Sequence, residues 1–231
     1  MTWLEHLRQP DRYGIVLLLI VIAMFAIAIF DEGLVGKAIS IVILGATLLF
    51  ALRTSRASRR IRRVAWICVP TLLIVSFIVA ADDSEIGREA LSVIVGIVVL
   101  AVLVAIVARI SVHLTVSGST LLAGLCIYLL IGLFYATVYG FIDVSSSGRL
   151  FVQTSTPSAT DTLYFSFITM TTVGYGDLTP AENVTKILAA TEALSGQIYL
   201  VTAVALLVGN LGRTRRRLTE RRDDEADRST E

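Results

Sequence analysis

The sequence of 231 residues is poor in charge and in cysteine. Charged residues make up 17% of the chain, against about 25% in an ordinary soluble domain, while 55% are hydrophobic and the mean hydropathy is +0.77. This shortage of charge excludes a soluble globular domain and a disordered chain. Two cysteines exclude a disulfide scaffold. The formal net charge of +1 argues against a nucleic-acid partner.

The residue patterns of enzyme chemistry are also missing. We find no nucleophile–base pair, no cluster of residues at metal-ligand spacing and no phosphate-binding loop with Gly-Lys-Ser or Gly-Lys-Thr. We therefore expect no catalytic residue and no cofactor, and we do not expect an enzyme.

Long hydrophobic runs dominate what the sequence does contain. A membrane-spanning helix needs about 20 mostly apolar residues, and its backbone must satisfy its own hydrogen bonds. The sequence therefore predicts an all-α membrane protein with six transmembrane helices. The runs cover Tyr13–Phe30, Leu34–Leu52, Val64–Ala81, Ile86–Ala108, Thr120–Ile142 and Asn183–Leu211.

The positive charges predict the orientation of these spans. With the N-terminus inside the cell, 16 of the 20 Lys and Arg residues fall in inside segments, as expected for cytoplasmic loops. We expect a multi-pass protein of the cell membrane with both termini in the cytoplasm. An arginine-rich loop either sets this topology or binds anionic lipid head groups through Arg53, Arg56, Arg59, Arg60, Arg62 and Arg63.

The segment between the fifth and sixth runs contains a short apolar stretch. Leu163–Met170 is too short to cross a membrane, and a glycine-rich turn follows it, as in a re-entrant segment. Ser158 and Asp161 have the spacing of a capping box, which predicts a short helix that begins there and runs to about Thr171.

The next residues, Thr172-Val173-Gly174-Tyr175-Gly176-Asp177, resemble the signature of the potassium channel family. The resemblance implies that the short helix is a pore helix and that four such loops meet on one axis. Backbone carbonyls of Thr172, Val173, Gly174 and Tyr175 would then replace the water around K⁺. Carbonyls point to one axis only if the backbone alternates in hand, which glycine tolerates best, hence Gly174 and Gly176.

The resemblance also assigns roles around this selectivity filter. It implies that Asp177 lies at the outer mouth, that Tyr164 reaches Asp177 and that Phe165 packs near Tyr175. Ile168 stands where a model channel of the family has a glutamate that partners the aspartate, so that contact is absent here.

The last hydrophobic run has the features of the family's inner helix. Gly196 is either a hinge or a small residue that lets helices approach closely. The buried carboxylate expected at Glu192 either modulates the pore or makes a structural hydrogen bond behind the pore helix, for example to Thr169. The resemblance implies a face that lines the inner cavity, formed by Gln197, Leu200, Val204 and Val208.

These observations divide the chain into three parts. Residues 1–118 form a four-helix membrane domain in the position of a voltage sensor, residues 119–212 form the pore domain, and residues 213–231 form a charged tail or helix extension. The fourth run has no basic residue between Arg88 and Arg109, so we expect no steep voltage dependence.

One pore loop per chain predicts a homotetramer. The predicted function is passive, potassium-selective conduction, with K⁺ as the transported ion. A weakly selective cation channel with the same architecture is one alternative. A non-conducting membrane sensor or subunit that retains a pore-like loop is the other.

Overall fold

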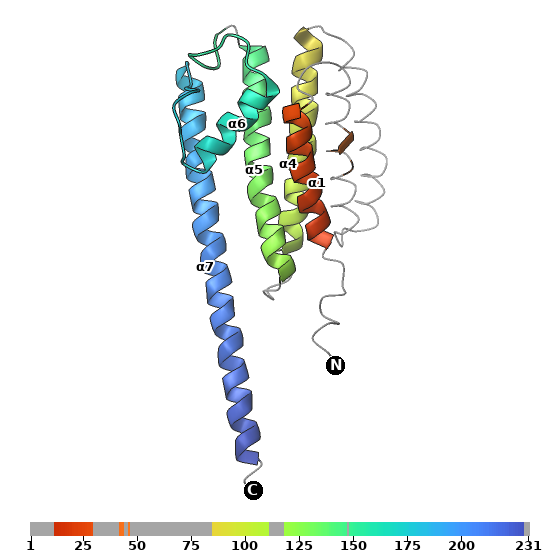
Figure 1. The fold of residues 1–231 in the computed structure, drawn as a ribbon, viewed down its shortest axis with the longest axis vertical. Coiled ribbons are helices and arrows are strands. Elements are labelled where there is room, and N and C mark those ends of the chain that lie inside the picture. Colours follow the sequence, from red (N-terminus) through yellow and green to blue (C-terminus); the bar gives the residue numbers. More distant parts are fainter. Residues whose placement is uncertain are drawn as a thin grey trace.

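The computed structural model describes residues 12–29, 42–43, 46, 85–110, 118–146 and 148–228. Within these residues the named helices are α1, α4, α5, α6 and α7 (Figure 1). They span Arg12–Ile29, Glu85–Ile110, Gly118–Ser145, Ala159–Met170 and Asn183–Arg228, in that order. The second and third predicted spans lie outside the described residues except for short pieces, and so does the whole arginine cluster from Arg53 to Arg63.

Four of the hydrophobic runs coincide with described helices, namely α1, α4, α5 and α7. Two of these helices contain segments long and apolar enough to cross a membrane, Leu121–Ser145 and Asn183–Leu206. The apolar helices in α1 and α4 are shorter, covering Gly14–Ile29 and Ser92–Ala101. Six spans are therefore not demonstrated by the described residues.

The helix α7 is longer than the last hydrophobic run. It continues as one helix of 46 residues to Arg228, so most of the charged tail is a helix extension. Figure 1 shows this lower half of α7 projecting well beyond the other helices.

Helix α5 is the centre of the packing. Figure 1 shows α1 and α4 on one side of it and α7 on the other, with α6 lying obliquely between α5 and α7. One apolar cluster joins α5 to α1, α4 and α6 because hydrophobic faces of all four helices meet there. Its buried members are Val16, Ile20, Val98, Val99, Ala123, Cys126, Ile127, Leu130, Leu133, Ala136 and Leu163.

A second cluster lies at the end of α5 that leads into α6. It consists of Tyr139, Leu150, Phe151, Phe165 and Ile168. The chain before α6 also pairs with the chain before α7, since Val152 N–H donates to the Thr179 carbonyl (3.0 Å) and Ala181 N–H donates to the Leu150 carbonyl (3.0 Å). These two bonds fix the end of the loop between α6 and α7 against the chain before α6.

Candidate functional site: the backbone loop after α6

The start of α6 is fixed by the predicted capping box. Ser158 Oγ accepts the Asp161 N–H (3.1 Å), and Asp161 Oδ2 accepts the Ser158 N–H (2.9 Å). Two amides that would have no partner in the helix are satisfied in this way. The capping-box prediction is confirmed, and α6 ends at Met170 with Thr171 as its C-cap, close to the predicted end.

The end of α6 is a Schellman motif whose left-handed residue is a threonine. Thr172 N–H donates to the Thr169 carbonyl (3.0 Å) and Val173 N–H donates to the Ile168 carbonyl (2.9 Å), which are the two bonds of that motif. Thr172 has φ +61°. The left-handed residue is usually glycine, and a β-branched residue there carries strain of about 1–3 kcal/mol.

The loop then alternates in backbone hand. Thr172, Gly174 and Gly176 have φ of +61°, +49° and +81°, while Val173 and Tyr175 between them do not have positive φ. The alternation was expected at the two glycines. The third left-handed position, Thr172, was missed, although its place directly after the C-cap is the signal that identifies it.

Four consecutive carbonyl groups of this loop have no partner within the described part of the chain. No described hydrogen bond is accepted by the backbone oxygens of Thr172, Val173, Gly174 or Tyr175. These four residues are exposed in the single chain, so their carbonyls are free to bind water or an ion. The C-terminal end of α6, which carries partial negative charge, points toward the same loop.

Asp177 is held by a side chain of α6. Tyr164 Oη donates to Asp177 Oδ2 at 2.7 Å, and Asp177 Oδ1 accepts the N–H of Leu178 at 3.1 Å. The hydrogen bond to Asp177 raises the pKa of Tyr164 to about 12. The expectation that Tyr164 reaches Asp177 agrees with this geometry.

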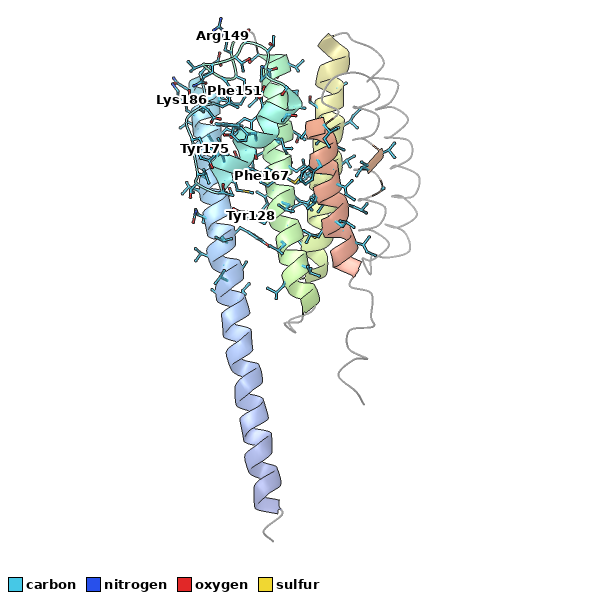
Figure 2. The ribbon with its side chains drawn as sticks, viewed as in Figure 1. Tyr128, Arg149, Phe151, Phe167, Tyr175 and Lys186 are labelled. Atoms are coloured by element: carbon cyan, nitrogen blue, oxygen red, sulfur yellow. The ribbon has the colours of Figure 1, made fainter. Side chains whose placement is uncertain are left out.

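The ring of Phe165 packs differently from the expectation. It makes edge contacts with Tyr139 (5.1 Å between centroids) and with Phe151 (4.9 Å), because Phe165 lies on the buried face of α6. Contact with Tyr175 is not among the described ring contacts, and Tyr175 is 73% exposed in the single chain. Figure 2 shows Phe151 and Tyr175 toward the end of the molecule that also carries Arg149 and Lys186.

Gly196 lies directly against the end of α6. A Cβ atom placed there would stand 2.5 Å from Met170 Cγ and 2.8 Å from the Met170 carbonyl oxygen. Of the two interpretations of this glycine, the structure supports close approach between α7 and α6. The hinge interpretation stays a prediction.

The residues predicted to line the inner cavity lie on the face of α7 that the rest of the chain leaves uncovered. Gln197, Leu200 and Val204 are exposed in the single chain, and the side chain of Val208 lies outside the described part. The opposite face binds α5, since Ser195 Oγ lies 3.3 Å from Tyr135 Oη and Tyr199 Oη donates to the Gly124 carbonyl at 2.7 Å.

Glu192 is fully buried and has two side-chain partners. Tyr139 Oη on α5 lies 2.7 Å from Oε2, and Ser166 Oγ on α6 lies 2.5 Å from Oε1. The suggested partner Thr169 was wrong, because Ser166 occupies the face of α6 that meets α7. The sequence does not indicate Tyr139 or Ser166 as partners of Glu192, because both lie on other helices.

Comparison with known proteins identifies this region. The family described as "Ion channel" matches residues 124–212, which contain most of α5, all of α6, the loop and the first part of α7. The chain is 40% identical to "Two pore potassium channel a" of Oryza sativa subsp. japonica over 87 residues, which are 38% of this chain and 22% of that protein.

Two further similar proteins are also named as potassium channels. "Two pore potassium channel b" of the same rice is 54% identical over 43 residues, 19% of this chain and 12% of that protein. "Potassium voltage-gated channel subfamily A member 6" of Homo sapiens is 33% identical over 118 residues, 48% of this chain and 21% of that protein. The chain therefore spans about a fifth of the length of these relatives or less.

The matched segment holds the two helices that are long and apolar enough to cross a membrane, which together with the family indicates a membrane protein. Through this segment, which is less than half of the chain, the chain is similar to ion channels and to these potassium channels.

Proposed function

We propose that four copies of this chain form a channel that conducts K⁺ selectively along the axis where their Thr172–Gly176 loops meet. The observation that carries the proposal is the run of four carbonyls without partners, from Thr172 to Tyr175, on a backbone that alternates in hand. Carbonyl oxygens brought together by four chains replace the water that K⁺ loses on entry. Smaller Na⁺ gains less from ligands held at this spacing, which is the basis of the proposed selectivity.

The exposed surfaces of the single chain support assembly. Val173 is 50% exposed and Tyr175 is 73% exposed, although both are large hydrophobic residues in a loop fixed at both ends. On α7, Ile187, Leu194, Ile198 and Val201 are between 61% and 71% exposed. A hydrophobic surface of this size requires lipid or other copies of the chain. Because each chain brings one loop, closure around an axis needs a homotetramer with fourfold symmetry.

The directions of the helices agree with the proposed topology. In Figure 1, α1 and α5 run toward the end that carries α6, and α4 and α7 run away from it. The chain therefore leaves α1 and enters α4 at the same end, as an even number of crossings between them requires. We propose six spans, with both termini on the cytoplasmic side of the cell membrane and the filter's outer mouth outside.

The N-terminal part is proposed to be a scaffold without a voltage sensor. Helix α4 has no basic residue between Arg88 and Arg109, so it carries no charge that the membrane field can move. The loop with Arg53, Arg56, Arg59, Arg60, Arg62 and Arg63 is proposed to face the cytoplasmic leaflet, where anionic lipid head groups would bind it.

Ion flux from liposomes tests the proposal. Purified tetramer is reconstituted, and uptake driven by K⁺ and by Na⁺ gradients is compared with that of Gly176→Ala. At Gly176 a Cβ meets nothing within 4 Å, so alanine acts through the left-handed conformation and not through a clash. We expect K⁺ uptake, little Na⁺ uptake and a silent variant. Equal uptake of both ions would favour a weakly selective channel, and no uptake under any pH or voltage would favour a non-conducting subunit.

A further inference from the structure

The hydrogen-bond geometry around Glu192 limits where the protons of this site can lie. Ser166 Oγ is 2.7 Å from the carbonyl oxygen of Gly132 and 2.5 Å from Glu192 Oε1. Both distances are within the range of O–H···O hydrogen bonds. A serine hydroxyl has a single proton to donate, so it serves one of these two oxygens.

The carbonyl of Gly132 has no proton, so the serine proton must occupy the bond to Gly132. The contact between Ser166 Oγ and Glu192 Oε1 then needs a proton from Glu192. If Glu192 were a carboxylate, either this contact or the contact with Gly132 would bring two lone pairs together in a buried site. All three hydrogen bonds can form at once when Glu192 donates to Ser166, Ser166 donates to the Gly132 carbonyl, and Tyr139 donates to Glu192 Oε2.

The surroundings of Glu192 agree with a neutral acid. Glu192, Ser166 and Tyr139 all have 0% exposure. Among the described residues, the groups that contact the carboxyl are Tyr139 from α5 and Ser166 from α6, and no ion pair to Glu192 is described. A buried carboxylate without a cation is costly, whereas a carboxylic acid whose two hydrogen bonds are both satisfied is not.

Glu192 is connected to the Thr172–Gly176 loop through helix α6. Ser166 precedes Ile168 by two residues on α6, and the Ile168 carbonyl accepts the N–H groups of Val173 (2.9 Å) and Gly174 (3.1 Å). The position of α6 along α5 and α7 therefore sets the position of the first filter residues.

We propose that Glu192 is a positioning residue for the filter, and that it works as a neutral carboxylic acid that joins α5, α6 and α7. The inference about its role rests on the proposed function, since it concerns the geometry in which K⁺ is bound. The inference about its proton does not depend on conduction.

Infrared spectroscopy of the full-length protein at neutral pH tests the proton directly. The difference spectrum between wild type and Glu192→Gln should contain the C=O stretch of a carboxylic acid, above the amide region. Ser166→Ala should shift that band, because one of its hydrogen bonds is lost. A difference spectrum that contains the stretches of a carboxylate instead, with no acid band, overturns the proposal.

Flux of K⁺ into liposomes tests the role, with the tetramer content of each variant verified. Glu192→Gln places an amide donor toward Ser166 and an acceptor toward Tyr139, so it should keep K⁺ flux within about twofold of wild type. Glu192→Leu fills the space without these bonds and should lower K⁺ flux by about tenfold or more, the size expected for losing at least one buried hydrogen bond. Thr191→Val is the matched control, since the described bond of Thr191 stays within α7.

The infrared and flux experiments together distinguish failure of the positioning role from failure of the proposed function. If Glu192→Gln is as defective as Glu192→Leu in intact tetramers, the carboxyl does not act as a neutral junction and the proposal is wrong. If Glu192→Leu conducts like wild type, Glu192 has no positioning role. If wild type itself passes no K⁺, the proposed function and the positioning role fail together, while the infrared result still decides the protonation of Glu192.

Discussion

Tyr164 on α6 donates a 2.7 Å hydrogen bond to Asp177, just beyond the Thr172–Gly176 loop. The two residues are 13 positions apart in the sequence, and the segment between them contains every carbonyl proposed to bind K⁺. The Thr172–Gly176 loop is therefore held at its start by the Schellman motif and at its end by this side-chain pair. Two anchors of this kind fix a loop that has no regular secondary structure of its own.

Removing the hydroxyl of Tyr164 should loosen the outer end of the filter. We expect Tyr164→Phe to lower the thermal stability of the tetramer and to reduce its selectivity for K⁺ over Na⁺. The hydrogen bond to Asp177 raises the pKa of Tyr164 from 10.0 to about 12. A raised pKa means that the stabilisation is complete below about pH 10 and is lost as the pH rises through about 12.

The difference in stability between wild type and Tyr164→Phe should follow that pH dependence. Melting followed by fluorescence between neutral and strongly alkaline pH measures it. Tyr128→Phe serves as a control, because no hydrogen bond of the Tyr128 hydroxyl is described. A difference that is absent at neutral pH would show that the bond to Asp177 contributes nothing.

Gly196 should not tolerate a larger residue. In Gly196→Ala the new methyl group meets Met170 Cγ at 2.5 Å and the Met170 carbonyl at 2.8 Å, so α6 or α7 must move. Overpacking of this kind costs about 1–3 kcal/mol per chain. We expect a lower melting temperature of the tetramer and a loss of K⁺ flux.

Gly140→Ala is the matched control for Gly196→Ala. Gly140 lies inside α5, and a Cβ there meets nothing within 4 Å. Alanine is favoured over glycine in a helix by about 0.5–1 kcal/mol, so this variant should be neutral or more stable. If both variants have the same melting temperature and the same K⁺ flux, the contact between Gly196 and Met170 does not restrict residue 196 to glycine.

The capping box at Ser158 should contribute to the stability of the whole pore. Ser158→Ala removes the acceptor for the Asp161 amide, and loss of such a cap costs about 1 kcal/mol. Ser155→Ala, in the exposed loop before α6, should have no measurable effect. Thermal denaturation of the two variants in the same detergent provides the comparison, and equal melting temperatures would contradict a stabilising role for the cap.

Conduction should depend only weakly on voltage. One elementary charge that crosses the field is worth about 2.3 kcal/mol per 100 mV, or roughly 50-fold in an equilibrium. Because α4 has no basic residue between Arg88 and Arg109, we expect the open probability to change by less than about twofold over the same range. Recording single channels in planar bilayers at a series of voltages measures this, and a steep sigmoidal curve would contradict it.

Local features of the site were accessible from the sequence. The capping box depends on two residues three apart, and the two glycines of the filter mark backbone conformations that other residues avoid. The bounds of α5, to within about three residues, and the start of α7 also followed from long hydrophobic runs. Each of these is decided within a few residues or within one helix.

The remaining features depend on how helices are aligned, which one sequence does not specify. The partners of Glu192 come from two other helices, 53 and 26 residues away. The contact of Gly196 with Met170 likewise depends on the depth at which α6 enters between α5 and α7. Phe165 was assigned to the wrong neighbour because the buried face of α6 is set by Phe151 and Tyr139.

The reversal potential under bi-ionic conditions tests the central claim most directly. Purified tetramer in a planar bilayer separates a K⁺ solution from a Na⁺ solution of equal concentration, and the voltage of zero current is measured. We expect a large potential, negative on the K⁺ side, which disappears in Gly176→Ala together with the current. A wild-type current that reverses near zero would contradict potassium selectivity at Thr172–Gly176.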